Sequence, residues 1–372
     1  MSAGPWPPFH EAAGPLMDCR ITENDRARFK RCRRQWDFAS PHRRDLAPVG
    51  GVDAGLTAPL KDALAAYYYP GTWDWPHELK QSLVHKALKR ALDDSGETHA
   101  LESATALLDS YDAWATTVDD FAPVKIDHDV QALVPDPRDP ERGLTTPDGS
   151  AVIYTCRIDL LAIDAADEYW VVGHRIVDDW QESEALIRDE AAAAACWVWE
   201  QEYLGMEISG TIHNEVRISG PLDPPATDRS VSGAPRRVRQ SEPSGGGRAI
   251  PQHRRLLART ARTNDTNRVV QRTAGLIRRT QIRRSRAEIS LVPLFIGAEA
   301  IDMTNSPAIY PTFSPHCRVC EFSSPCLALI EGTDAETVLA QHFRRPATED
   351  STKPRLGQST WGFGRGAAPP GW

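Results

Sequence analysis

The 372-residue chain contains no apolar run of about 18 residues, which is the length that a membrane-spanning helix requires. Its opening residues, MSAGPWPPFHEAAGPL, lack the basic start and the apolar stretch of a secretory signal. We therefore expect a cytoplasmic protein with no membrane partner. An apolar content of 41% and a charged content of 25% are ordinary for a globular domain.

Lysine is absent between Arg229 and Arg286, although this stretch holds 16 arginines and only two acids. The stretch therefore carries a net charge of +14, and because the whole chain carries −8, the remainder carries −22. The negative total argues against general nucleic-acid binding, but the asymmetry indicates a segment that faces a polyanion. The alternative interpretation is a solvated basic loop.

The seven cysteines are odd in number, which argues against a disulfide framework and for a metal site. Cys317, Cys320 and Cys326 form a C-x2-C-x5-C arrangement, and its first two thiols can meet one metal from a tight turn. The best candidate for a fourth ligand is Cys32, because the arginines beside it favour its thiolate. The other options are Cys19, Cys156 and Cys196.

Four thiolates suit either zinc or an iron–sulfur cluster. Three clustered cysteines with a fourth far upstream are uncommon for structural zinc, which usually takes two close pairs. We therefore expect a [4Fe–4S] cluster, with zinc, or cysteines without any metal, as the alternatives. Either metal would join the two ends of the chain.

Hydrophobic periodicity predicts helices first, then strands, then a further helix and strand. The expected helices span 22–39, 59–119 in three parts, 184–205 and 271–303; the expected strands span 124–134, 151–163, 169–177 and 207–218. The predicted divisions are an N-terminal segment (1–50), a core (51–219), a Pro/Gly/Arg-rich linker (220–252), a basic helical segment (253–304), a cysteine region (305–345) and a tail (346–372). This order predicts a mixed α/β core with helical additions at both ends.

The strands 151–163 and 169–177 are expected to pair as a hairpin. Such a hairpin suits metal-dependent phosphodiester hydrolysis when one strand carries an aspartate and the next an acid and a lysine two residues apart. Asp159 supplies the first acid, whereas Gly173 and Arg175 stand where the second acid and the lysine belong. His174, on the opposite face, is expected to be a core residue.

The cysteine pattern and the hairpin together resemble a RecB-like nuclease domain of the PD-(D/E)XK superfamily, of the iron–sulfur type, over residues 20–330. The resemblance implies a restriction-endonuclease-like mixed sheet, flanked by helices and clamped by a structural four-cysteine cluster that consists of Cys32, Cys317, Cys320 and Cys326. It also implies that Asp159 in CRIDLLAI is a ligand of Mg²⁺ or Mn²⁺, and that WVVGHRIV is the altered strand of the acid-x-Lys motif.

Other family features depart from the pattern as well. Lys61 stands near the place of an upstream histidine, and the Gln-x3-Tyr pattern is missing from RDEAAAAACW. Arginine can hold a phosphate bidentately but cannot replace lysine chemistry, and glycine removes a metal ligand. The sequence therefore favours holding nucleic acid over cleaving it. A replacement ligand, if one exists, would be Glu190, Asp178 or Asp179.

The predicted helix 271–303 carries a stripe of arginines on one side, consisting of Arg278, Arg279, Arg283 and Arg284. Such a stripe can follow a phosphate backbone without reading sequence. A solvated helix face is the alternative.

Three functions follow. The first is a DNA-binding protein whose catalysis is lost or much altered, acting in DNA repair, recombination or defence with a helicase or another repair protein. The second is an active Mg²⁺- or Mn²⁺-dependent exonuclease or endonuclease with a relocated ligand. The third is a non-catalytic module that binds RNA or an acidic partner.

Overall fold

The computed structural model describes residues 18–49, 55–218, 229–230, 268–305 and 308–346. The strands are β1 Cys19–Thr22, β2 Ala47–Pro48, β3 Phe121–Leu133, β4 Pro135–Asp136, β5 Asp139–Gly143, β6 Val152–Asp164, β7 Tyr169–Val177, β8 Ile208–Arg217, β9 Arg229–Ser230, β10 Val269–Ala274, β11 Ile277–Arg283 and β12 Phe343–Arg344. The α-helices are α1 Glu23–Arg31, α2 Arg33–Ala39, α3 Thr57–Tyr67, α4 His77–Ser95, α5 Leu101–Val118, α6 Ser183–Ile187, α7 Glu190–Glu202, α9 Arg286–Asn305, α10 Ser323–Glu331 and α11 Ala335–His342. No helix in these ranges is long and apolar enough to cross a membrane.

Eight of the described strands form one mixed sheet. Seven follow the order β1-β6-β7-β8-β11-β10-β9, and β3 pairs with β6 in addition. The β1–β6 and β7–β8 pairs are parallel, whereas the other pairs are antiparallel. The expected mixed α/β sheet with flanking helices is therefore confirmed, and so is the hairpin of β6 and β7.

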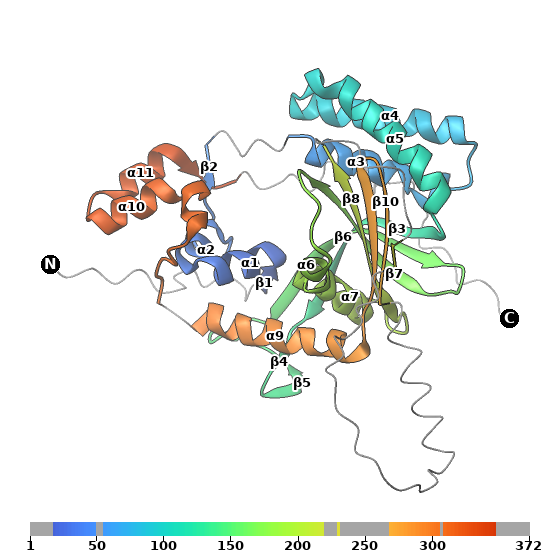
Figure 1. The fold of residues 1–372 in the computed structure, drawn as a ribbon. Helices are drawn as coiled ribbons and strands as arrows, with labels where there is room; N and C mark the ends of the chain where they lie inside the picture. The colour runs from blue at the N-terminus through green and yellow to red at the C-terminus, as the bar shows by residue number, and fades with distance from the viewer. Residues whose placement is uncertain (1–17, 50–54, 219–228, 231–267, 306–307, 347–372) are drawn as a thin grey trace, which may run out of the picture.

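The sheet separates two hydrophobic cores, and β7 shows why. Successive side chains of a strand point to opposite faces, so Trp170 and Val172 enter one core while Val171 enters the other. The first core is covered by α3, α4 and α5, which lie together above the sheet in Figure 1. The second core is covered by α7 and α9, with α1 beside them.

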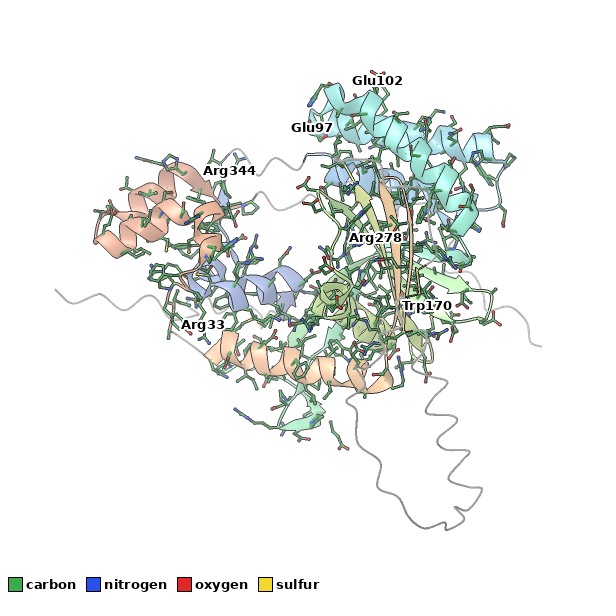
Figure 2. The ribbon with its side chains drawn as sticks, in the orientation of Figure 1. Arg33, Glu97, Glu102, Trp170, Arg278 and Arg344 are labelled. Carbon is green, nitrogen blue, oxygen red and sulfur yellow. The ribbon has the colours of Figure 1, made fainter. Side chains whose placement is uncertain are left out.

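The two ends of the described chain meet outside the sheet. β2 pairs with β12, so that Pro48 lies opposite Phe343 and Ala47 opposite Arg344. A small aromatic core of Phe38, Phe322 and Phe343 forms beneath this pair. Figure 1 shows α10 and α11 in red beside the blue N-terminal elements, and Figure 2 labels Arg33 and Arg344 in this region.

The N-terminal helix divides at the first cluster cysteine. The predicted start at Thr22 is confirmed, because Thr22 and Asp25 form a reciprocal capping box. The helix does not continue to 39, however, because Cys32 is extended, with a φ of −162° and a ψ of 115°, and separates α1 from α2.

The predicted basic helix over 271–303 is wrong in its first half. Residues 269–283 form the antiparallel strands β10 and β11, and only α9, from Arg286, is helical. A tight turn joins the strands, and Gly275 takes it with a φ of +56°, a conformation that glycine adopts at little cost. The basic segment 253–304 is therefore partly sheet within its described residues. The predicted linker (220–252) lies outside the described residues apart from β9, and so does the tail from 347.

Candidate functional site

The candidate site lies where β6 changes partners. One edge of β6 pairs with β3 over residues 153–164. The other edge is shared, because β1 pairs with Val152–Thr155 and β7 pairs with Leu160–Ile163. Residues 156–159 therefore have no strand partner on this edge of β6, and we call this gap in the strand pairing, between the end of β1 and the second half of β7, the opening. Asp159 is the last residue before the hairpin pairing begins.

Asp159 is held by two donors. Lys61 on α3 places its Nζ 3.2 Å from Oδ1 and 3.1 Å from Oδ2, and the backbone N–H of His174 donates to Oδ2 at 2.8 Å. At the point where β6 and β7 separate, the Asp159 carboxylate therefore accepts a backbone hydrogen bond from β7 that a backbone carbonyl of β6 would accept in a continuous sheet. An ammonium group already neutralises the acid that the resemblance assigns to a metal.

Gly173 and Arg175 lie where the hairpin predicts them, in β7. A Cβ added at Gly173 would meet no atom within 4 Å, so the missing acid leaves open space beside Asp159. Arg175 turns toward α7 instead, because it donates to Asp189 and, at 3.0 Å, to Gln181. Asp189 is the N-cap of α7, and no motif in the sequence indicates its pairing with Arg175.

The three suggested replacement acids do not join Asp159. Glu190 accepts from Lys30, and from Arg26 at 3.2 Å. Asp178 and Asp179 lie beyond the end of β7. Within the described residues, no group of three or more histidine, cysteine, aspartate or glutamate side chains is arranged to hold a metal ion.

Two buried histidines lie next to Gly173, one in β7 and one in β8. His174 is confirmed as a core residue, because its ring stacks on that of Tyr68 with the ring centroids 5.4 Å apart. Burial lowers the pKa of His174 to about 4. His213 lies opposite Gly173 on β8, and burial lowers its pKa to about 3, with Arg175 as the next influence. Both imidazoles are therefore neutral near pH 7. His213 was missed because nothing in the sequence places β8 beside Gly173.

The arginines predicted to form a phosphate-binding stripe do not form one. They lie on β11 and at its end, and Arg278, Arg279 and Arg284 are buried. Figure 2 shows Arg278 among the strands of the main sheet. The prediction fails because residues on a strand alternate between two faces, and these residues enter the protein on both sides of the sheet.

Each described arginine from 268 to 286 is paired with an acid. The pairs are Arg268–Glu288, Arg272–Asp120, Arg278–Glu215, Arg279–Asp119, Arg283–Glu168, Arg284–Glu288 and Arg286–Glu200. This part of the basic segment is therefore neutralised within the fold. Eight further arginines of the arginine-rich stretch between Arg229 and Arg286, from Arg236 to Arg262, lie outside the described residues.

The four cysteines of the predicted cluster lie where the N-terminal helices meet residues 312–326. Thr312 links two of them, because its N–H donates to Cys32 Sγ at 3.4 Å and its carbonyl accepts from Cys317 Sγ at 3.8 Å. Arg34 donates to Cys326 Sγ at 3.6 Å. Burial raises the pKa of Cys320, and Cys32 and Cys317 act on it in the same direction.

These four thiols lie in one region of the structure but do not point toward a common centre. We expected a cluster of four cysteines to join the two chain ends. The described part of the chain contains no such cluster, because no three ligating side chains converge there. The ends meet instead through the β2–β12 pair and the aromatic core beneath it. Cys156 and Cys196 contact the second core, which α7 and α9 cover, and Cys196 is fully buried. Both therefore behave as the small apolar side chains that we expected.

Comparison with known proteins does not assign a family to this chain. No protein-family model matches the sequence, and no curated protein sequence matches it. The chain is distantly similar to a solved structure, the crystal structure of SSO0001, with a TM-score of 0.29 and 10% identity. That match covers 72% of this chain and 84% of SSO0001.

Proposed function

We propose that this chain binds DNA through sequence-independent backbone contacts, on a PD-(D/E)XK-like scaffold whose metal-dependent catalysis is lost or much altered. The observation that best supports the loss of catalysis is the pairing of Asp159 with Lys61, 3.1 Å apart. A cation of the chain itself occupies the carboxylate that catalysis would need for a divalent metal.

The chemistry of hydrolysis supports the same view. Mg²⁺ and Mn²⁺ prefer oxygen ligands, and phosphodiester cleavage needs such an ion to activate water and to stabilise charge on phosphorus. Here Gly173 offers no oxygen from a side chain, and Asp189 is engaged by Arg175. Asp159 alone is a poor metal site, and Lys61 makes it a poorer one.

Binding of a phosphate backbone needs cations that solvent can reach. The side chains of Lys61 and Arg175 are 41% and 31% exposed, and they pair with Asp159 and Asp189 beside this opening. A phosphate that replaces one of these acids as the partner gains a charge-assisted hydrogen bond. We place the DNA backbone across this opening, with a helicase or another repair protein as a further partner in repair, recombination or defence.

The Asp159–Lys61 pair predicts opposite effects for its two members. Asp159→Asn removes the negative charge and frees Lys61, so DNA affinity should rise and the salt dependence should steepen by about 0.9 in log–log slope, equivalent to one added phosphate contact. Lys61→Met leaves Asp159 unpaired and should weaken binding. Fluorescence anisotropy of labelled DNA between about 50 and 200 mM salt measures both effects.

The same preparations test the alternatives. Cleavage of end-labelled DNA with Mg²⁺ or Mn²⁺ that disappears in Asp159→Asn would mean an active nuclease with a relocated ligand. Tighter binding of RNA of the same sequence would favour the interaction module. Weaker DNA binding by Asp159→Asn would contradict the placement of the backbone beside Lys61.

We propose, in addition, that Cys32, Cys317, Cys320 and Cys326 bind a [4Fe–4S] cluster, with zinc as the alternative. The residue types fit, because four thiols lie at one junction and Arg34 and Thr312 already donate to two of the sulfurs, although the thiols do not converge on one point in the described residues. Hydrogen bonds to sulfur are a feature of protein-bound clusters, in which they tune the potential. The cluster would supply structural cross-linking of the two chain ends.

This proposal predicts brown protein when purification excludes oxygen, with broad absorbance near roughly 400 nm. Cys317→Ala should lose the colour and lower the melting temperature, because metal binding and folding are coupled. Cys19→Ala is the matched control and should keep both the colour and the melting temperature. A colourless wild-type protein that contains one zinc would replace the iron–sulfur assignment with zinc.

A further inference from the structure

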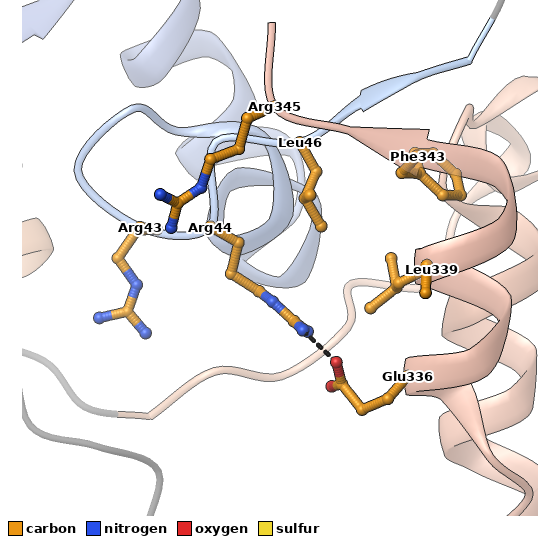
Figure 3. A pocket seen from close by; sticks show the side chains of 8 residues that line it. Arg43, Arg44, Leu46, Glu336, Leu339, Phe343 and Arg345 are labelled. Carbon is orange, nitrogen blue, oxygen red and sulfur yellow. Dashed lines mark hydrogen bonds and ion pairs between the residues drawn. The ribbon is translucent and has the colours of Figure 1, made fainter.

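A pocket of about 340 Å³ lies where the two chain ends pair, and it shares no residue with the Asp159 site. One side of the pocket is apolar and consists of Leu46, Leu339 and Phe343, which stand together in Figure 3. Phe343 is buried and stacks on Phe322 with ring centroids 4.9 Å apart, so its position is fixed. The pocket therefore has a rigid apolar wall.

The other side of the pocket carries three guanidinium groups. Figure 3 shows Arg43, Arg44 and Arg345 reaching into it from one side. Glu336 is the acid of the lining, and it pairs with Arg44 at 2.5 Å. The lining holds three arginines against one acid, and Asp37, which pairs with Arg43 at 2.5 Å, lies outside the lining. The positive charge that these acids leave uncompensated is that of Arg345.

The arginines differ in what holds them. Arg43 is positioned by Asp37, whose Oδ1 accepts from its Nε at 2.6 Å. Arg345 is exposed and forms no ion pair or hydrogen bond with any residue in the described ranges. Arg345 can offer its planar fork of N–H donors to a phosphate, and Arg43, held by Asp37, adds a fixed positive group at the same pocket.

An apolar wall and a group of arginines within one small pocket suit an amphipathic anion. A pocket of this volume lies at the small end of the range for small-molecule sites. A nucleotide unit combines a flat, apolar base face, which can pack on the apolar wall, with a phosphate. Inorganic phosphate would leave the wall of Leu46, Leu339 and Phe343 unused.

We infer that this pocket binds one nucleoside monophosphate unit, with its base against Leu46 and Phe343 and its phosphate at Arg345 and Arg43. The unit can come from a free mononucleotide or from the phosphorylated end of a strand, which share this chemistry. The inference goes beyond DNA binding at the Asp159 opening and does not require it.

The experiment titrates the full chain with dAMP, deoxyadenosine and inorganic phosphate by calorimetry. We expect dAMP to bind about tenfold or more tightly than either fragment, because only dAMP uses both sides of the pocket. Arg345→Glu should weaken dAMP binding by about tenfold or more, whereas Glu336→Gln should strengthen it by releasing Arg44. Effects of opposite sign cannot both come from misfolding.

Arg90→Glu is the matched control for Arg345→Glu. It makes the same charge change on an exposed arginine of α4, outside the pocket, and should leave dAMP binding unchanged. Oligonucleotides with a 5′-phosphate, a 3′-phosphate or neither distinguish a strand end from a free nucleotide. Preference for a phosphorylated end, or for dAMP over all oligonucleotides, supports the pocket and identifies the source.

Three results would overturn the inference. They are equal affinity for inorganic phosphate and dAMP, an unchanged affinity in Arg345→Glu, and a loss of affinity in Glu336→Gln. The two proposals fail separately. If the chain binds dAMP but not DNA, only the proposed function at Asp159 is contradicted. If the chain binds DNA in a way that responds to Asp159→Asn but does not bind dAMP, only the inference about the pocket is contradicted.

Discussion

Replacement of Arg279 by leucine is expected to lower the free energy of unfolding by about 3–5 kcal/mol, the largest effect of any single substitution considered for this chain. Arg279 is 3% exposed, and its Nη2 lies 2.7 Å from Asp119 Oδ1. Its Nε donates to Asn214 at 2.8 Å, and its guanidinium lies over the rings of Trp114 and Phe121. Leucine would leave the Asp119 carboxylate buried without its cation.

The pH dependence of this loss has a defined sign. Burial raises the pKa of Asp119, and Arg279 is the largest opposing influence. Without Arg279 that pKa rises further above the unfolded value, so the contribution of Asp119 to stability is present at low pH and is lost as the pH rises through the folded pKa. The deficit of Arg279→Leu relative to wild type should therefore be greatest near pH 7 and should shrink in acid.

Arg283→Leu is the matched control on the same strand. Arg283 pairs with Glu168, but its side chain is 51% exposed, and surface pairs contribute about 0–1 kcal/mol. Urea unfolding of wild type and both variants at several pH values measures the difference. A folded Arg279→Leu of near wild-type stability that has lost DNA affinity would mean that Arg279 binds phosphate and is not a buried structural residue.

Restoration of the missing acid is the second large effect. Gly173→Asp combined with Lys61→Ala should create a divalent-metal site beside Asp159. The antiparallel pair Leu160–Val172 makes Asp159 and residue 173 the next neighbours, and a Cβ at 173 meets no atom within 4 Å. Lys61→Ala removes the ammonium that now pairs with Asp159. Two carboxylates with bound waters suffice to hold Mg²⁺.

Metal-dependent stability gives the measurement. At a Mn²⁺ concentration of about ten times Kd, binding to the folded state adds roughly 1.4 kcal/mol to stability, which a melting curve resolves. Gly173→Asn with Lys61→Ala is the control, since asparagine has the same shape without the charge, and it should show no such gain. If the wild type gains as much as the double variant, a ligand for the metal already exists elsewhere in the site.

Local pattern predicted the hairpin at the site, but it did not predict what completes the site. Apolar and polar residues alternate in 151–163 and 169–177, and this pattern is visible in the sequence without knowledge of the fold. The strands β6 and β7 could therefore be predicted from the sequence alone. The partner of Asp159 on α3, the partner of Arg175 on α7 and the neighbour His213 on β8 depend on tertiary packing. The family resemblance placed Lys61 near the site but did not predict its pairing with Asp159.

The arginines of β11 show why charge patterns mislead. A run of arginines reads as a solvated or phosphate-binding face because an unpaired buried charge is costly. Arg278 and Arg279 are buried because Glu215 and Asp119, which are distant in the sequence, compensate them. The short turn at Gly275 was the available signal for a hairpin, and the helical interpretation passed over it.

The pairing of β2 with β12 has a consequence for how the chain is made. Ala47 and Pro48 emerge from the ribosome long before their strand partners, Arg344 and Phe343. Contacts between such distant residues raise the contact order and slow folding. During synthesis, Phe38 has no aromatic partner until Phe322 and Phe343 have been added, so the growing chain exposes this aromatic surface for that time. Chains truncated before residue 343 should consequently need chaperones more than chains that include residues 343 and 344.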